Sequence, residues 1–177
     1  MKKYLFLMLA LSLVFAGCGK ADSPGGLQPT QAPVQLANPY GTYETAQEME
    51  QAAGLEVSLP EQLPDWVQET IYRAIPGELI EVIYTTREDP NDIQEIRVRV
   101  KEGNEDITGV YGSDAQEAKT VQVGENTVEL QGVTLETTGE FLVFVSKWTS
   151  EEGRTYSVTS TQGVLQQELI PLLEQIR

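Results

Sequence analysis

Most of the chain between residues 66 and 161 consists of β-rich runs that come in pairs, with a short turn inside each pair. Two β-rich runs around such a turn predict a β-hairpin. No helical stretch separates the runs, whereas parallel strands need long crossover connections, which are usually helices. The pattern therefore predicts an antiparallel sheet with hairpins over residues 66–86, 119–133 and 140–161, turning at Pro76-Gly77, Gly124-Glu125-Asn126 and Glu151–Arg154.

A further strand is expected over residues 93–103, where apolar and basic side chains alternate. Two runs that are apolar on both faces, Leu79–Tyr84 and Phe141–Val145, indicate central strands of the sheet. Because successive side chains of a strand point to opposite faces, residues 93–103 should place Ile96, Val98 and Val100 on one face and Arg97, Arg99 and Lys101 on the other.

Helix signals flank the β-rich region. Thr45 followed by Glu48 forms a capping box, in which each side chain bonds to a backbone amide at the helix start. Met49 and Ala53 are expected to face inward, and Gly54 is a typical stop. At the C-terminus, apolar residues recur as on one face of a helix, with Pro171 expected to kink the helix or delay its start: Leu165, Leu169, Leu172, Leu173 and Ile176.

Together these elements predict an α+β domain over residues 43–177. Its core is an antiparallel, curved sheet of hairpins, with the N-terminal and the C-terminal helix packed on one face. Residues 55–59 alternate before Pro60 and are expected to form a short edge strand, and residues 104–118 are expected to form a loop.

The N-terminus has the pattern of a secretory signal. Lys2 and Lys3 precede an apolar run that reaches Phe15, and small residues follow directly before Cys18. This run is shorter than the roughly 20 apolar residues that a membrane-spanning helix needs. Residues 1–17 are therefore expected to be a signal peptide, and the chain to be exported.

Cys18 is the chain's one cysteine and has no internal disulfide partner. The stretch Phe15-Ala16-Gly17-Cys18 resembles the lipobox of bacterial lipoproteins, with Phe15 where leucine is usual. The resemblance implies cleavage before Cys18 and a lipid with acyl chains such as palmitate on its sulfur. The expected location is the extracytoplasmic face of the cell membrane, with two or more acyl chains giving stable anchoring. The alternative is a stray cysteine in a plain signal peptide.

Residues 18–42, after the signal, are rich in proline and glycine and are expected to form a tether. The formal net charge of the chain is −15. A chain this acidic is repelled by the phosphates of nucleic acids, which excludes nucleic acid as a partner.

Several stretches of the domain resemble one family. They include "AAGLEVSLPEQLP", "IEVIY", "IRVRV", "KWTSEEGRTYSVTS" and "LIPLLEQI". Together they resemble an uncharacterised domain of unknown function found in clostridial and other Gram-positive secreted and lipid-anchored proteins. The resemblance covers about residues 45–177. It implies an extracytoplasmic β-rich domain and supplies no catalytic residues.

The residue inventory disfavours catalysis. The chain contains no histidine, which removes Ser-His-Asp triads, Cys-His dyads and histidine metal sites. Acidic residues are plentiful, but no pair stands out as the two carboxylates of a glycoside hydrolase. We therefore expect a non-enzymatic protein without a cofactor.

Two groups of residues are candidates for binding. The basic face of residues 93–103, formed by Arg97, Arg99 and Lys101, fits an anion or partner contact, but cross-strand pairing with acids such as Glu81 is the favoured interpretation. The acidic turn around residue 90 fits a weak site for a hard cation or a plain polar turn, its ligands being Asp89, Asn91 and Asp92.

Trp66 and Trp148 fit either a ligand platform or the edge of a core. The sequence as a whole predicts a lipid-anchored binding or interaction module of the cell envelope, whose partner is an unknown envelope protein or ligand. The alternative is a carrier or sensor that holds a lipid or other hydrophobic ligand in a groove between sheet and helices.

Overall fold

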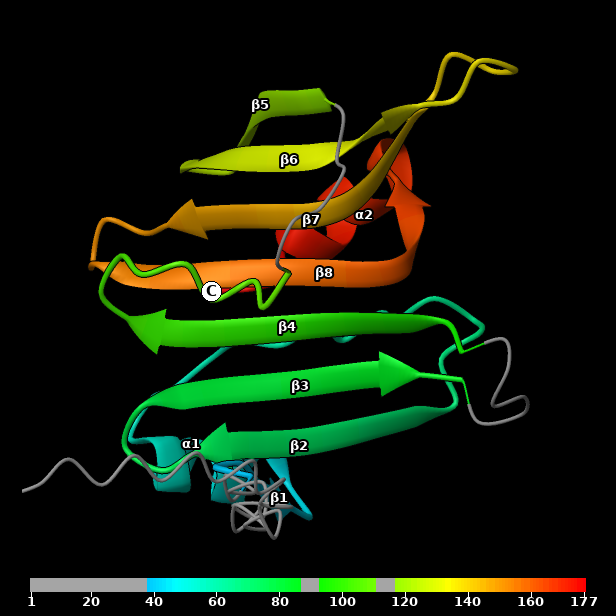
Figure 1. The fold of residues 1–177 in the computed structure, drawn as a ribbon. Coiled ribbons are helices and arrows are strands. Elements are labelled where there is room, and N and C mark those ends of the chain that lie inside the picture. The colour runs from blue at the N-terminus through cyan, green and yellow to red at the C-terminus, as the bar shows by residue number, and fades with distance from the viewer. Residues whose placement is uncertain (1–37, 87–92, 111–116) are drawn as a thin grey trace, which may run out of the picture. The chain divides into compact units, whose positions relative to one another are not determined.

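The β-rich runs join into one open antiparallel sheet (Figure 1). The computed structural model describes residues 38–86, 93–110 and 117–177. In this part of the chain the fold is mainly β, with eight strands in the order β1-β2-β3-β4-β8-β7-β6-β5 and two helices. The strands are β1 (Gly41–Tyr43), β2 (Glu69–Ile75), β3 (Leu79–Thr85), β4 (Glu95–Glu102), β5 (Glu117–Val123), β6 (Asn126–Thr134), β7 (Phe141–Thr149) and β8 (Arg154–Leu165).

Two meanders make up this sheet. Strands β1 to β4 pair in chain order, and so do β5 to β8, while β8 pairs with β4 and joins the two meanders in the middle. The three predicted hairpins are present as β2–β3, β5–β6 and β7–β8. The turn of the first contains Gly77 with φ 69°, a left-handed conformation that favours glycine.

Both predicted helices are present. Helix α1 (Ala46–Ala53) begins where the Thr45 side chain accepts a bond from the Glu48 amide at 3.2 Å, and it ends at Gly54 with φ 69°. The return bond of the capping box differs from expectation, because Glu48 accepts from the amide of Glu44. Helix α2 (Gln166–Leu173) contains Pro171.

The core lies against one side of the strands. Alternate strand residues such as Val82, Val98 and Val158 are buried there. The buried side chains of the two helices belong to the same hydrophobic cluster, and those of the C-terminal region match most of the predicted stripe: Met49, Ala53, Leu169, Leu172, Leu173 and Ile176.

Two expectations about individual elements are wrong. Leu165 ends β8 and lies directly before α2, because it still pairs with Leu142 of β7. Residues 55–59 form no strand. Ser58 exchanges backbone hydrogen bonds with Arg177, but its neighbours have no such ladder partner among the described residues. At the start of the expected domain, Gly41–Tyr43 form β1 and pair with β2.

Candidate functional site

The face of the sheet opposite the core carries a row of polar residues that runs from one edge to the other. Each member is the cross-strand partner of the next, so the side chains point to the same side. We call it the cross-sheet row: Thr42, Arg73, Glu81, Arg99, Ser157, Lys147, Glu129 and Thr120.

The half of the row on β2 to β4 is closed by ion pairs. Glu81 is only 1% exposed and lies among three arginines. Its carboxylate is 2.7 Å from Nε of Arg99, 3.2 Å from Nη1 of Arg73 and 3.7 Å from Nε of Arg97. We call these four residues the arginine cluster. Arg97 also contacts Glu95 at 2.6 Å.

The basic face of β4 is therefore paired internally. Arg97 and Arg99 share Glu81, and Lys101 contacts Glu78 at 3.0 Å and Glu105 at 2.6 Å. This is the cross-strand pairing that the sequence allowed for. A contact of Arg97, Arg99 and Lys101 with an external anion or partner stays a prediction.

Residues 103–110, which we call the wall segment, leave the end of β4 and pass over β8 (Figure 1). Arg99 fixes this segment, because its Nη1 donates to the carbonyls of Ile107 at 3.0 Å and Thr108 at 2.7 Å. Gly109, with φ 66°, lies so close to the Arg99 guanidinium that a Cβ there would collide with it. Thr155 supports the other end by donating to the Gly103 carbonyl at 2.5 Å.

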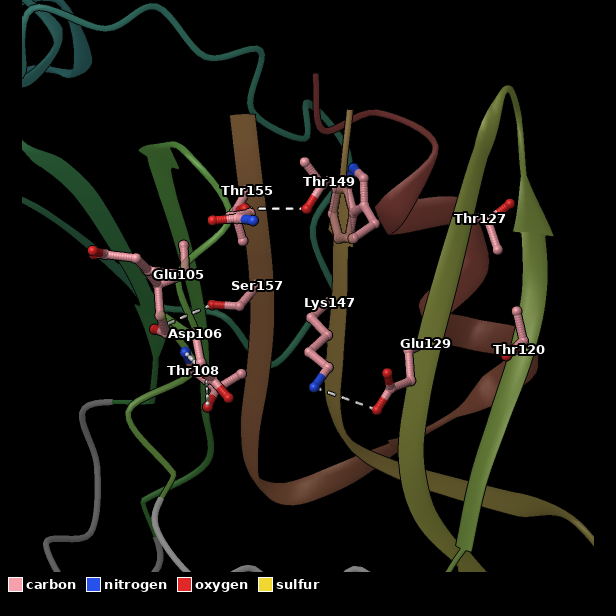
Figure 2. Close-up of a pocket in the computed structure, with 13 residues that line it drawn as sticks. Glu105, Asp106, Thr108, Thr120, Thr127, Glu129, Lys147, Thr149, Thr155 and Ser157 are labelled. Atoms are coloured by element: carbon pink, nitrogen blue, oxygen red, sulfur yellow. Dashed lines mark hydrogen bonds and ion pairs between the residues drawn. The ribbon is translucent and has the colours of Figure 1, made fainter. Parts of the chain in front are cut away.

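Between the wall segment and hairpin β5–β6 lies a pocket of about 370 Å³, which we call the polar pocket (Figure 2). Strands β7 and β8 form its floor, and the second half of the cross-sheet row lies within it. Hydroxyl groups and charges dominate its lining: Thr108, Thr120, Thr127, Thr149, Thr155, Ser157, Glu105, Asp106, Glu129 and Lys147.

The charged groups of the polar pocket hold defined positions. Lys147 extends from the floor, with Nζ 3.4 Å from the carboxylate of Glu129. Asp106, on the opposite wall, accepts bonds from the amide of Thr108 at 2.9 Å and its hydroxyl at 2.8 Å. These two bonds, the amide first, hold the pKa of Asp106 below its ordinary value. A hydrogen bond from Lys101 likewise lowers the pKa of Glu105.

A second cavity, of about 510 Å³, lies between α2, the loop around Trp66 and the ends of β4, β7 and β8. We call it the helix–sheet groove. Apolar side chains such as Trp66, Leu142 and Leu172 line it together with Gln94 and Gln175. Helix and sheet both contribute to its walls, as the carrier alternative requires.

The two tryptophans do not form a common platform. Trp148 is 5% exposed and stacks on Tyr156 in the core, with ring centroids 5.0 Å apart and an interplanar angle of 4°. Trp66 is half-buried and belongs to the helix–sheet groove.

Other predicted site residues lie outside the described residues. This holds for Cys18 and for the acidic turn with Asp89, Asn91 and Asp92. Within residues 38–86, 93–110 and 117–177, no group of three or more Cys, Asp or Glu side chains is arranged to hold a metal ion. The described helices are all too short or too polar to span a membrane.

The sequence patterns did not predict the residues of the polar pocket as a site. Thr120, Glu129, Lys147 and Ser157 lie far apart along the chain, and the order of the strands makes them neighbours. The available signal was the alternation of hydroxyl residues in residues 155–159, which marks a polar strand face but not its neighbours.

Comparison with protein-family models, with curated proteins and with solved structures finds no match to this chain. The export signal, the lipid on Cys18 and the family resemblance therefore stay predictions from the sequence.

Proposed function

We propose that this protein is a lipid-anchored, extracytoplasmic binding module of the bacterial cell envelope, without catalytic activity, and that the polar pocket is its binding site. The observation that carries the proposal is the polar pocket itself, a concave site of about 370 Å³ on the sheet face opposite the core. Concave sites of about 300–1,000 Å³ with convergent polar groups are typical of ligand binding.

The placement of the helices supports this role. The buried side chains of α1 and α2 share one cluster with the core side of the strands. We infer that both helices cover the same face, which leaves the polar pocket on the opposite face accessible to a partner. A tether over residues 18–42 lets such a partner approach the domain away from the lipid headgroups.

The chemistry of the pocket favours binding over catalysis. A general acid near neutral pH needs a raised pKa, as in glycoside hydrolases, whereas the pKa values of Asp106 and Glu105 are lowered. Ser157 and Lys147 are cross-strand neighbours, but each side chain has another partner. The Ser157 hydroxyl donates to the carbonyl of Ile107, and Lys147 pairs with Glu129.

The anchoring is tested on the full-length chain expressed in a Gram-positive host. Mass spectrometry is expected to show an acylated Cys18 at the mature N-terminus, and the protein in the membrane fraction. Cys18→Ala is expected to release the protein or leave it unprocessed. An unmodified N-terminus at another residue contradicts the anchoring.

The binding site is tested by filling the polar pocket. Thr120 is exposed and lines the pocket, so Thr120→Trp is expected to block capture of envelope components without unfolding the protein. The control is Gln122→Trp on the same face of β5, because Gln122 is exposed but does not line the pocket. Equal capture by both variants, or substrate turnover that depends on one acidic residue, contradicts the proposal.

The carrier is the second candidate, because the helix–sheet groove has walls from both α2 and the sheet. The volume of this groove, about 510 Å³, exceeds that of the polar pocket, about 370 Å³. A hydrophobic ligand there lies against Trp66, so stoichiometric binding of a fatty acid that changes Trp66 fluorescence favours the carrier. A Trp66→Phe variant separates this signal from that of Trp148.

A further inference from the structure

We propose that the polar pocket recognises a cationic group, the ammonium of a small amine or of a lysine side chain. This inference rests on the binding role proposed above and names the ligand chemistry of the same site. It combines three observations: the charge of the lining, the position of Lys147 and the pairing of the neighbouring arginines with acids.

The charge of the lining favours a cation. Three carboxylates, those of Glu105, Asp106 and Glu129, line the pocket with one ammonium, that of Lys147. Glu105 is also paired with Lys101 at 2.6 Å, so the formal charge of the lining together with Lys101 is −1. The formal net charge of the whole chain, −15, has the same sign. A cation approaching the pocket therefore gains from both the local and the long-range field.

The position of Lys147 shows where such a cation fits. Its ammonium reaches from the floor into the space between Glu129 on β6 and Asp106 on the wall segment (Figure 2). The distance of 3.4 Å to Glu129 is longer than the about 2.7–2.9 Å of a tight charge-assisted hydrogen bond. Lys147 thus neutralises the pocket only loosely, and a ligand cation competes with it for the same carboxylates.

The neutral part of the lining suits the same chemistry. Thr149, Thr155 and Ser157 place hydroxyl oxygens on the floor, and hydroxyl oxygens accept bonds from N–H donors. Trp148 belongs to the lining, but its ring stacks on Tyr156 in the core and offers no flat platform. An anionic ligand finds less support, because the arginines of the arginine cluster are already paired with Glu81 and Glu95.

The test uses the full-length protein in detergent and four probes. Three are capped tripeptides, Gly-Lys-Gly, Gly-Gln-Gly and Gly-Glu-Gly, and the fourth is n-butylammonium, titrated by NMR. We expect saturable binding of the lysine peptide, weakened by salt because exposed charges are screened over about 8 Å at physiological ionic strength. If n-butylammonium binds as tightly as the lysine peptide, the ligand is a free amine. If the peptide binds more tightly, the ligand is a protein segment.

The direction in which Lys147→Met changes the affinity for the lysine peptide is the decisive test. This variant removes the Lys147 ammonium, which competes with the ligand, and keeps an apolar side chain of similar length. We expect it to tighten lysine-peptide binding by about two- to fivefold, the range of an exposed ion pair. Glu129→Gln and Asp106→Asn are expected to weaken it by a similar factor. The control is Glu136→Gln, which removes an exposed acid outside the pocket lining, and it should leave affinity unchanged.

Three outcomes overturn the inference: weaker lysine-peptide binding by Lys147→Met, equal binding of the glutamine peptide, and no binding of either cationic probe. The proposed function fails separately, when envelope components bind Thr120→Trp as well as the unmodified protein. Thermal unfolding of each variant confirms that the fold is retained.

Discussion

The two halves of the face opposite the core contain the same kinds of charged group but differ in what surrounds them. On β3, Glu81 is 1% exposed and has arginines from β2 and β4 around it. On β6, Glu129 is 41% exposed and has a single lysine at 3.4 Å. The first carboxylate is part of a closed network, and the second borders an open pocket.

The cause of this difference is the distribution of partners along the cross-sheet row. In the β2–β4 half, carboxylate and guanidinium groups alternate and neutralise each other. In the β5–β8 half, short hydroxyl side chains separate the charges and leave space above the floor. A basic stripe in a sequence is thus a poor guide to a binding site when an acid lies on the neighbouring strand.

The largest expected effect comes from breaking the closed half. Glu81→Gln removes the negative charge that three arginines share, and loss of one partner of a buried ion pair costs about 3–5 kcal/mol. We expect the free energy of unfolding, measured in urea, to fall by this amount. Glu78→Gln is the matched control, because its side chain is 50% exposed and its pair with Lys101 is worth at most about 1 kcal/mol. Similar values for both variants contradict the division into closed and open halves.

The next effect tests the support behind the open half. Leu169 of α2 is 3% exposed and belongs to the core cluster behind the floor of the polar pocket. Leu169→Ala is expected to lower the free energy of unfolding by about 2–5 kcal/mol, as is usual for a truncated core leucine. Val110→Ala is the control, because Val110 is 40% exposed. An unchanged melting curve for Leu169→Ala means that α2 is not docked on the sheet.

Arg99 belongs to both halves, and its replacement sharpens the comparison. Arg99→Lys keeps the positive charge next to Glu81 but removes the guanidinium Nη1, which donates to the carbonyls of Ile107 and Thr108. Since a hydrogen bond from a charged donor is worth about 1.5–3 kcal/mol, we expect faster amide hydrogen exchange in the wall segment. Arg97→Lys is the control on the same strand face. If amide exchange in the wall segment rises equally in both variants, Arg99 has no specific role.

The smallest effect concerns pH. Because the pKa of folded Asp106 lies below its ordinary value of 3.8, its contribution to stability is complete above that value and is lost as pH falls through the lowered pKa. Asp106→Asn should therefore cost at most about 1 kcal/mol near neutral pH, since the residue is exposed, and less at pH 3. The control is Glu125→Gln in the β5–β6 turn. A difference between Asp106→Asn and the unmodified protein that is constant with pH contradicts this role.

Much of the fold was predictable because its signals are local. Thr45 and Gly54 bound α1 through bonds within one helical turn, and Pro76-Gly77 sets the β2–β3 turn through its own backbone preferences. The alternation in β4 placed Arg97, Arg99 and Lys101 on one face, as expected. Where a local pattern had no partner strand, as in residues 55–59, the prediction of a strand was wrong.

The sequence by itself determined most of the strands and which side of an alternating strand is polar, because side chains alternate with a period of two residues. Only the tertiary structure decided that β4 pairs with β8, which puts Arg99 opposite Ser157 although they are far apart in the chain. That pairing creates the cross-sheet row, and the wall segment held by Arg99 then turns half of the row into a pocket. The physical reason is that strand order and register are set by burying one common core, and no short stretch of sequence contains that information.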